Sequence, residues 1–215
     1  MQWTDVNHKY FQAIDNPEKA YWLGFLYADG CVYETRKDVY ALTVALHEKD
    51  LDILEQFKTD IKSAAKINPT KNGVGEQNNY RINIYSHELC LDLIEHGCIP
   101  RKTFKAEFPE LMEELYPHFI RGYFDGDGHV SHRSGRKAPR LHISGNDAFI
   151  DGLQDYFKCR KITSYKLRNG NIFRLEVSAK KSVANFYNFI YRDATRYMNR
   201  KKTVFDKVYA NTETA

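Results

Sequence analysis

Apolar and polar positions along this chain follow a pattern that occurs twice. Two strongly apolar stretches with helix-compatible composition, residues 22–30 and 120–128, each carry small residues four positions apart and end in Asp-Gly. After each stretch the apolar residues recur at every second position, near 40–47 and near 140–144, as in a half-buried strand. A recurrence over about half the chain predicts two structurally related halves.

Each half is predicted to contain the same series of elements: helix, two strands, helix, two strands, helix. After the first hairpin, amphipathic helices are expected to begin near Asp50 and Asp147. Second hairpins and last helices follow, at residues 66–85 and 86–96 in the first half and 160–178 and 180–192 in the second. We therefore predict an α+β protein with half-domains at residues 1–116 and 117–215.

The Asp-Gly pairs are typical of helix C-termini. Gly30 and Gly128 are expected to adopt the left-handed conformation that stops a helix. Asp29 and Asp127 then lie in a last turn, where the helix dipole disfavours a carboxylate by roughly 0.3–1 kcal/mol. The same unfavourable charge in both halves indicates a use other than stability. The simplest is a divalent cation, which aspartate and a helix C-terminal carbonyl can both ligate.

The small residues indicate how the two apolar helices meet. Gly24 lies four positions before Ala28, and Gly122 lies four positions before Gly126, so each pair occupies one helix face. Small residues on a face allow two backbones to approach closely. If the helices pack through these faces, their terminal acids come together at one end.

The two stretches resemble the paired motifs of a LAGLIDADG homing endonuclease of the single-chain, two-repeat kind. Tyr27 departs from the pattern, because the motif usually has Asp there, but this position is not the metal-binding acid of the family. The resemblance implies two αββαββα half-domains around a pseudo-twofold axis, with antiparallel sheets that form a DNA-binding saddle. It is carried by Gly24, Ala28, Asp29 and Gly30 in the first motif and by Gly122, Asp125, Gly126, Asp127 and Gly128 in the second.

The resemblance also implies an activity, the hydrolysis of both strands of DNA at a long, pseudo-palindromic target. Asp29 and Asp127 would be catalytic metal ligands, with the carbonyls of Ala28 and Gly126 as further ligands. The expected cation is Mg²⁺ or another divalent ion such as Mn²⁺, which can activate water and stabilise the leaving oxygen. Members of the family cut across the minor groove and leave short 3′ overhangs.

Further candidates for the chemistry come from matched positions in the two halves. Basic clusters follow the last helix of each half, at the position where the family has its basic residues, so the resemblance implies that Lys102 and Lys201 stabilise developing charge or orient water. The alignment of the clusters leaves Lys202 open as an alternative to Lys201. His47 and Ser144 end matched strands, where the family often has a polar residue that organises water, so the resemblance makes both candidates for that role.

The polar faces of the predicted strands carry the DNA-binding argument. Arg, Lys, Asn and Gln suit base edges in the major groove, which accepts a ribbon of strands, whereas residues at hairpin tips suit phosphates. The candidates are Arg36, Lys37, Lys66, Asn72, Gln77, Asn79, Arg81, Asn83, Arg133, Arg136, Lys137, Arg140, His142, Arg160, Lys161, Lys166, Arg168, Asn169, Asn171 and Arg174.

Charge and cysteine content indicate which ligands the protein attracts and in which compartment it is expected. The net charge is +4, but residues 1–116 hold 13 Lys and Arg against 19 Asp and Glu, and residues 117–215 hold 19 against 9. The second half therefore supplies most of the attraction for a polyanion. Four cysteines without a CxxC pair indicate reduced thiols in the cytosol or an organelle matrix. An apolar run long enough for a membrane span and a signal peptide are both missing, so secretion is not expected.

Two alternatives use the same scaffold. One is an intron RNA maturase, and the other is a DNA-binding regulator without catalysis. Asp29 and Asp127 together favour cleavage over the regulator, because a protein that only binds gains nothing from two acids beside phosphates. They do not separate the endonuclease from the maturase. We expect a monomer that is intron-encoded or free-standing, since no protein-splicing segment flanks the motifs.

Overall fold

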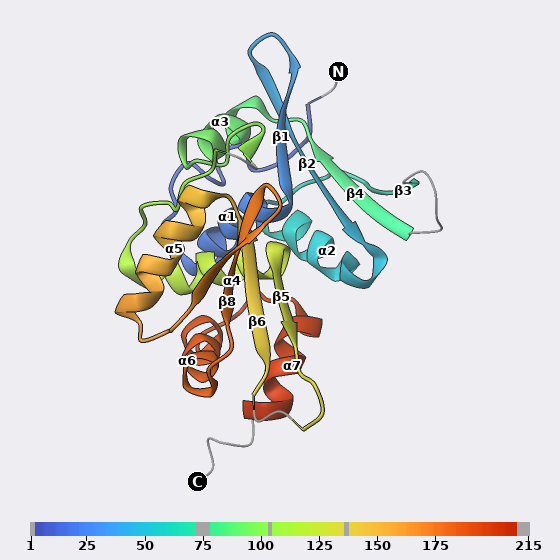
Figure 1. Ribbon diagram of the computed structural model, residues 1–215. Coiled ribbons are helices and arrows are strands. Elements are labelled where there is room, and N and C mark those ends of the chain that lie inside the picture. Colours follow the sequence, from blue (N-terminus) through green and yellow to red (C-terminus); the bar gives the residue numbers. More distant parts are fainter. Residues whose placement is uncertain (1–2, 72–77, 103–104, 136–137, 210–215) are drawn as a thin grey trace.

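A computed structural model describes residues 3–71, 78–102, 105–135 and 138–209 of this protein. Its centre is a pair of helices that lie side by side, α1 (Pro17–Asp29) and α4 (Tyr116–Asp127) (Figure 1). Both begin with a proline in the first turn, where a missing N–H and a fixed φ cost nothing. One antiparallel sheet follows each helix along the chain, so the helix pair occupies the junction between two halves.

The first half follows the predicted order of elements. Its strands form one antiparallel sheet in the order β1-β2-β4-β3, with α2 and α3 packed against β2. Its elements are β1 (Gly30–Arg36), β2 (Val39–His47), the short 3₁₀ helix η1 (Glu48–Asp50), α2 (Leu51–Asp60), β3 (Ile67–Lys71), β4 (Asn78–Ile84) and α3 (His87–Glu95).

The second half repeats this arrangement with sheet order β5-β6-β8-β7. The short helix η3 (Glu113–Leu115) leads into α4, and the predicted division after residue 116 falls in the first turn of that helix. The elements that follow α4 are β5 (Gly128–Ser131), β6 (Arg140–Gly145), α5 (Asp147–Cys159), β7 (Tyr165–Asn169), β8 (Ile172–Val177), α6 (Lys180–Tyr191) and α7 (Asn199–Tyr209). The predicted α+β class with two related halves is confirmed.

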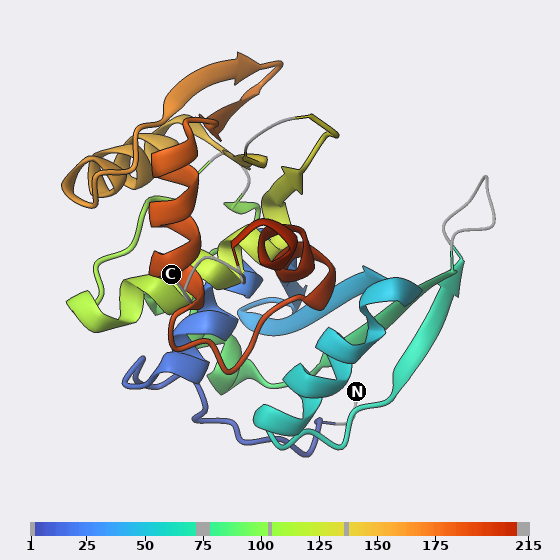
Figure 2. The ribbon, with the colours of Figure 1, turned by 90° about the horizontal axis from the view of Figure 1, so that it is seen from below.

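Alternating burial explains why each sheet has one apolar face and one polar face. In β2, Leu42, Val44 and Leu46 are buried, and in β6 the buried residues are Leu141 and Ile143. These side chains join a continuous apolar core with the helices, which drives the packing because it removes hydrocarbon from water. Figure 2 shows the two sheets reaching away from the helix pair in different directions.

Ion pairs join the end of the chain to the first half. Arg196 Nε donates to Asp60 Oδ2 at 2.7 Å, and its Nη2 donates to Glu18 Oε2 at 3.1 Å. Arg200 binds Asp50 through two hydrogen bonds of 2.7 and 3.0 Å. Two-point contacts of this kind restrain orientation as well as distance, so they hold α7 and the residues before it against the first half. None of the described helices has the length and apolar character needed to cross a membrane.

Candidate functional site

The two central helices touch through their backbones. A Cβ atom added to Gly24 would lie 2.0 Å from the carbonyl oxygen of Phe119, and one added to Gly122 would lie 1.9 Å from that of Tyr21. Both distances are far inside van der Waals contact, so only glycine fits at either position. The predicted packing of α1 on α4 through their small residues is confirmed.

The same packing brings the two acidic ends together. A Cβ atom added to Gly126 would lie 2.3 Å from the Cβ of Ala28 and 3.2 Å from Oδ2 of Asp29. Gly126 directly precedes Asp127, so both motif carboxylates lie at one end of the helix pair. Within the described residues no cluster of three or more His, Cys, Asp or Glu has metal-binding geometry, so the two aspartates form the acidic group here.

The left-handed conformation predicted for the two motif glycines is wrong. Gly30 has φ −74° and ψ 145°, and Gly128 has φ −88° and ψ 153°, so each helix passes directly into an extended strand. Glycine is required for a different reason. A Cβ atom would lie 2.7 Å from the carbonyl oxygen of Leu26 in one case and 2.2 Å from the Phe124 ring in the other.

Burial makes both carboxylates hard to ionise. Burial raises the pKa of Asp29 to about 6, helped by the negative charge of Asp127 and opposed by Lys201 and Lys102. Burial also raises the pKa of Asp127, against the pull of Lys102 and then of Lys201, although part of this residue reaches solvent. The folded protein therefore holds two close carboxylates at a cost that a bound cation would relieve.

Lysines from distant segments bind the carbonyls at the ends of both helices. Lys102 Nζ donates to the carbonyl of Gly30. Lys201 Nζ donates to the carbonyl of the matching Gly128 at 2.5 Å, and also to those of Phe124 at 2.7 Å, Asp125 at 2.6 Å and Gly126 at 3.3 Å. Each lysine thus supplies positive charge where the helix dipole is negative.

The contacts identify the lysine that matches Lys102. Lys201 makes the matching contact, whereas Lys202 forms an ion pair of 2.8 Å with Asp206 one turn further along α7. Burial lowers the pKa of Lys201 to about 8, opposed by the negative charge of Asp125 and reinforced by the positive charge of Arg200. Lys201 is only 4% exposed, so it is part of the packed centre rather than a surface charge.

Residues of both halves line a cavity of about 190 Å³ beside the acids. Asp127 and Ser144 come from the second half, and Ala28 and Lys102 come from the first. Ser144 faces this space, as its predicted role requires. His47 instead lies at the end of β2, where its Nδ1 accepts the backbone N–H of Lys49 at 3.2 Å. A cavity of this size has room for several waters and an ion.

Strand register decides which of the predicted DNA-binding residues lie on the polar sheet faces. The face opposite the buried side chains of β4 carries Asn79, Arg81 and Asn83, and that of β8 carries Arg174. Arg140 and His142 share this face in β6, and Asn169 shares it in β7. Arg36, Lys37, Lys66, Arg133, Arg168 and Asn171 are exposed at strand ends and turns, and Asn72, Gln77, Arg136 and Lys137 lie outside the described residues.

Three predicted DNA-binding residues lie elsewhere. Lys166 pairs in register with Leu175, a buried residue, and its Nζ binds Asp147 and Asp151 of α5, so it points toward the helices. Arg160 and Lys161 follow α5 and line a separate cavity beside α6. Arg160 and Lys161 were placed on a strand that starts too early, because β7 begins only at Tyr165, whereas Lys166 lies in β7 but on the face that packs against the helices.

A transverse row of residues crosses each polar face, and sequence reasoning named only one member of each as a candidate, His142 and Asn83. In the second sheet His129 pairs with His142, which pairs with Glu176. The two imidazole rings stack with centroids 5.1 Å apart, and burial lowers the pKa of His142, as do the nearby charges of Arg174 and His129. The row in the first sheet holds Cys31, Thr43 and Asn83. Both rows could have been identified from the sequence, because every second residue after Gly30 and after Gly128 lies on the same face of its strand.

The two motifs differ at Tyr27 in the first half and Asp125 in the second. Each of these residues binds its central helix to the segment that carries the lysine of that half. In the second half Asp125 Oδ2 accepts the backbone N–H of Met198 at 2.8 Å, three residues before Lys201. In the first half Tyr27 donates its hydroxyl to the carbonyl of His96 at 2.6 Å, six residues before Lys102. Different chemistry thus makes the same connection in both halves.

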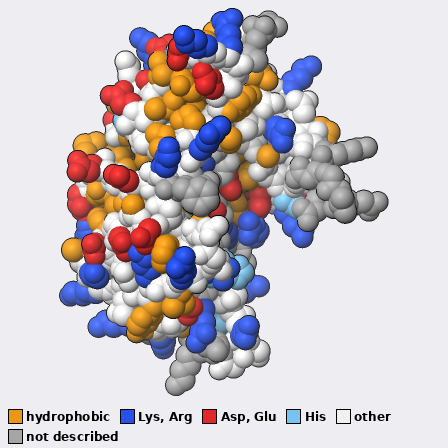
Figure 3. All heavy atoms as spheres, turned by 45° about the horizontal axis from the view of Figure 1, so that its top comes forward, with side chains coloured by type: hydrophobic (Ala, Val, Ile, Leu, Met, Phe, Trp, Pro, Cys, Tyr) orange, Lys and Arg blue, Asp and Glu red, His pale blue; other side chains and the backbone are white. Residues whose placement is uncertain are grey.

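Charges on the surface are mixed. Figure 3 shows Lys and Arg side chains interspersed with acidic and apolar patches on the visible face, which agrees with the modest net charge of +4. Electrostatic attraction for a polyanion must therefore come from local groups such as the strand faces, rather than from a uniformly basic surface.

Comparisons with known proteins agree with the resemblance seen in the sequence. Residues 114–191 match the family model of a LAGLIDADG-like domain. The fold resembles the LAGLIDADG meganuclease I-AabMI bound to uncleaved DNA, with a TM-score of 0.62 and 17% identity over 93% of this chain and 92% of that one. It also resembles the homing endonuclease I-SmaMI bound to cleaved DNA, with a TM-score of 0.57 and 15% identity over 88% and 86% of the two chains.

Two further matches are a solved structure with a lower TM-score and a curated protein that is much longer than this chain. A structure of I-SmaMI with an uncleaved DNA target and calcium ions has a TM-score of 0.54 and 14% identity over 82% of this chain and 85% of that one. A probable translation initiation factor IF-2 of Methanocaldococcus jannaschii is 28% identical over 183 residues, which cover 78% of this chain. The matched region is only 14% of the length of that factor.

Proposed function

Because this chain carries a LAGLIDADG-like domain within the fold of the LAGLIDADG homing endonucleases, we propose that it is a site-specific, divalent-metal-dependent double-strand DNA endonuclease. The observation that carries the proposal is the meeting of Asp29 and Asp127 at one end of the helix pair, with Lys102 and Lys201 beside them. Two acids and two cations at a pseudo-twofold axis suit two phosphodiester bonds, one on each strand.

The donor set fits a hard divalent cation. Both carboxylates have pKa values raised by burial, and Asp29 also by the charge of its partner, so a positive ion would favour their ionised forms. Asp29 and Asp127 would hold the ion or ions, with the carbonyls of Ala28 and Gly126 as further oxygen ligands. Mg²⁺ is the expected ion, and it would supply activation of water and stabilisation of the leaving oxygen. That one relative was studied with calcium supports a divalent requirement.

The lysines have a different task from the acids. Lys102 and Lys201 would lie near the scissile phosphates, Lys201 from within the packed centre, and offset the negative charge that develops during hydrolysis. Hydrogen bonds to helix carbonyls fix the orientation of both ammonium groups, which reduces the reorganisation needed when the phosphate is attacked. Ser144 lines the cavity beside Asp127, where it can hydrogen-bond to a water molecule.

DNA would lie across the polar faces of the two sheets. Arg81, Asn83 and Arg174 lie on these faces with side chains suited to base edges and phosphates. The rows nearest the helix ends differ between the halves, Cys31-Thr43-Asn83 in one and His129-His142-Glu176 in the other. A target with unequal half-sites around its centre follows from that difference. DNA in the structures of two relatives supports this partner.

The test is substitution of one acid at a time. Asp127→Asn removes a charge while keeping the shape of the side chain, so the variant should bind target DNA and fail to cut at least one strand. Binding is measured by electrophoretic mobility shift in Ca²⁺, and cleavage by the separation of nicked, linear and intact plasmid in Mg²⁺. Undiminished double-strand cleavage would refute the assignment of Asp127. Binding without any metal-dependent cleavage by the unaltered protein would favour a regulator.

A further inference from the structure

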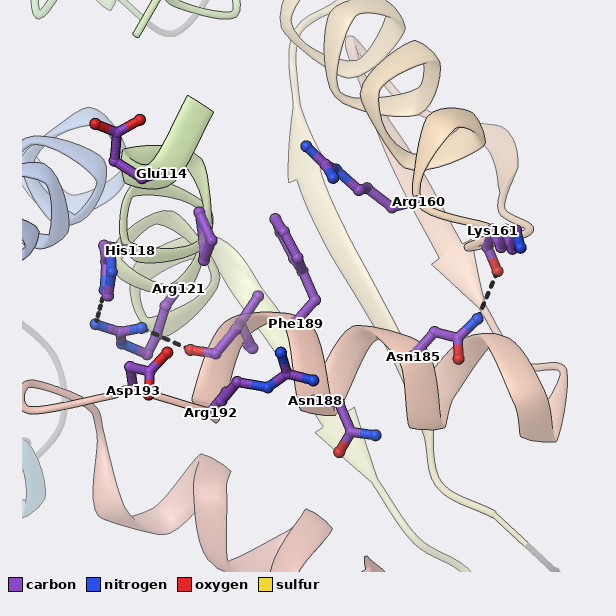
Figure 4. A pocket seen from close by; sticks show the side chains of 12 residues that line it. Glu114, His118, Arg121, Arg160, Lys161, Asn185, Asn188, Phe189, Arg192 and Asp193 are labelled. Atoms are coloured by element: carbon purple, nitrogen blue, oxygen red, sulfur yellow. Dashed lines mark hydrogen bonds between the residues drawn. The ribbon is translucent and has the colours of Figure 1, made fainter. Parts of the chain in front are cut away.

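A second cavity formed by described residues has no part in the site above. It has a volume of about 560 Å³ and lies between the start of α4, the turn after α5 and the second half of α6 (Figure 4). His118 lines it from α4, Lys161 from the turn after α5, and Asn188 and Phe189 from α6. Nine residues of helix separate His118 from Asp127, or about 14 Å along α4 at 1.5 Å per residue.

One of the positively charged side chains in this cavity has an acidic partner, and two others have none among the described residues. Arg160 forms an ion pair with Glu113, and its guanidinium lies over the rings of Tyr156 and Phe189 at 5.1 and 5.7 Å. The remaining two cations at the rim, Lys161 and Arg192, have no carboxylate within ion-pair distance in the described part of the chain. Both side chains are exposed, and both line the cavity. The carboxylates of Glu114 and Asp193 also line the cavity, so its attraction for an anion is local, at Lys161 and Arg192.

Two groups deeper in the cavity are hydrogen-bond donors. Arg121 is fully buried and donates to the carbonyls of Ile190 at 2.6 Å and Arg196 at 2.7 Å. Its Nη2 lies 2.9 Å from Nδ1 of His118, and since a guanidinium can only donate, this imidazole nitrogen is an acceptor. Burial and the charge of Arg121 lower the pKa of His118 to about 4, so the ring is neutral and carries its proton on Nε2.

A third donor has no acceptor at all. Arg160 Nε is buried, and none of the described residues accepts a hydrogen bond from it. A buried donor without a partner costs free energy, on the order of 1–3 kcal/mol, unless a ligand or water satisfies it. In Figure 4, Arg160 and Arg192 lie on either side of the Phe189 ring, and Asn188 projects beside Arg192.

We propose that this cavity binds a nucleotide unit, as a second nucleic-acid-related site separate from the saddle. Arg192 and Lys161 bind the phosphate, and the ring of Phe189 supports the base by stacking. The amide of Asn188 offers a donor and an acceptor to the edge of the base. The volume of about 560 Å³ lies within the range of pockets that enclose small ligands.

Two ligands contain such a nucleotide unit, a free nucleotide and a segment of single-stranded RNA. Both present a phosphate beside a base with a flat face, and both fit the same groups. A double-stranded DNA target does not expose its bases in this way, so it is not a competitor for the cavity. Because the cavity lies at the other end of α4 from the acids, occupation by a nucleotide does not require an empty saddle.

The experiment measures binding by fluorescence anisotropy with the full chain. The probes are fluorescein-labelled adenosine monophosphate and a short labelled single-stranded RNA of mixed sequence, each with and without excess unlabelled target duplex. Arg192→Glu and Lys161→Glu should each weaken binding at least about tenfold, because each replaces attraction to phosphate by repulsion. Lys181→Glu, an equal charge change on an exposed residue of α6 outside the cavity, should have little effect.

The results separate the two sources and can overturn the proposal. RNA bound at least about tenfold more tightly than the mononucleotide identifies a strand, and equal affinity identifies a free nucleotide. The site is refuted if neither probe binds below roughly 1 mM, if Lys181→Glu weakens binding as much as Arg192→Glu, or if the duplex displaces the probe. Thermal unfolding of each variant shows whether lost binding reflects lost folding. DNA cleavage by Arg192→Glu should remain normal, so this test is independent of the endonuclease proposal.

Discussion

Asp127 of the second half and Lys102 of the first half line one cavity, although 25 residues and the boundary between the halves separate them. Lys102 is the cation that acts most strongly on the carboxyl of Asp127, whereas Lys201 acts most strongly on that of Asp29. Lys102 also acts on Asp29, and Lys201 also acts on Asp127, so the two acids share both cations. The charged groups of the site come from both halves, so cleavage should require both.

Substitution of Lys102 should therefore affect the acid of the other half. Lys102→Met removes the ammonium group and keeps the length of the side chain, which should raise the pKa of Asp127 further and slow cleavage roughly 10²–10³-fold at one strand. The measurement is the rate of nicking and of linearisation of a supercoiled plasmid. Lys202→Met is the matched control, because Lys202 pairs with Asp206 instead. Equal slowing by both variants would contradict the assignment.

The raised pKa of Asp29 predicts how stability changes with pH. A carboxyl whose pKa rises from 3.8 to about 6 on folding stabilises the fold below pH 3.8, and this contribution is lost as pH rises through 6. In metal-free buffer at pH 7, Asp29→Asn should therefore unfold with a free energy about 1–2 kcal/mol higher than the unaltered protein, a value reduced for partial solvent exposure. At pH 4 the difference should nearly vanish. Urea denaturation at both pH values measures it.

Glu110→Gln is the control for this pH dependence. Glu110 is exposed, and its replacement should change the free energy of unfolding little at either pH. Added Mg²⁺ should raise the stability of the unaltered protein more than that of Asp29→Asn, because binding to the folded state stabilises it by mass action. A variant that is less stable than the unaltered protein at pH 7 would show that Asp29 makes favourable contacts as an anion.

Contact between the two helix backbones predicts the cost of a single methyl group. Gly122→Ala would place a Cβ atom 1.9 Å from the carbonyl oxygen of Tyr21, so α4 must move away from α1. The helix propensity of alanine favours the variant by about 1 kcal/mol, but the loss of packing between the helices should outweigh it and give a net loss of roughly 2–4 kcal/mol. Gly145→Ala meets only side chains, the nearest at 3.0 Å, and should cost much less. Thermal and urea unfolding of both variants provide the comparison.

Features determined by local pattern could be predicted from the sequence, and features determined by packing between distant segments could not. The helix face of Gly24 and Ala28 and the alternation in β4 are local, and both were predicted correctly. The extended conformation of Gly30 was missed, because Asp-Gly is equally compatible with a left-handed stop and with a close approach to Leu26.

Long-range contacts decided the remaining cases. The sequence left Lys201 and Lys202 open, because only the fold shows which side chain reaches the carbonyl of Gly128. Arg160 and Lys161 were predicted on a strand because the second hairpin of this half was expected to begin at residue 160. Their place in a cavity depends on how α6 packs beside α4, and no property of the residues themselves reports that.

Asp125 should be the costliest residue of the second motif to neutralise, because its charge is fully buried among cations. Its Oδ2 accepts hydrogen bonds from the Met198 N–H at 2.8 Å and from the Tyr21 hydroxyl at 3.0 Å, and Lys201 and Arg121 lie near it. Burial raises the pKa of Asp125 to about 6 against the pull of Lys201, so part of the attraction to the cations is already offset by burial. The cost of Asp125→Asn then comes mainly from a weakened hydrogen-bond acceptor and should be about 1–3 kcal/mol.

Tyr27→Phe is the matched variant at the equivalent position of the first half. It removes one neutral hydrogen bond, to the carbonyl of His96, and should cost only about 1 kcal/mol. Urea denaturation compares the two losses, and hydrogen exchange at the Met198 amide reports whether the segment before Lys201 has loosened. Faster exchange at Met198 in Asp125→Asn, without a change at the amides of α3, would show that this carboxylate positions Lys201. Equal losses for both variants would mean that the connection depends on shape rather than on charge.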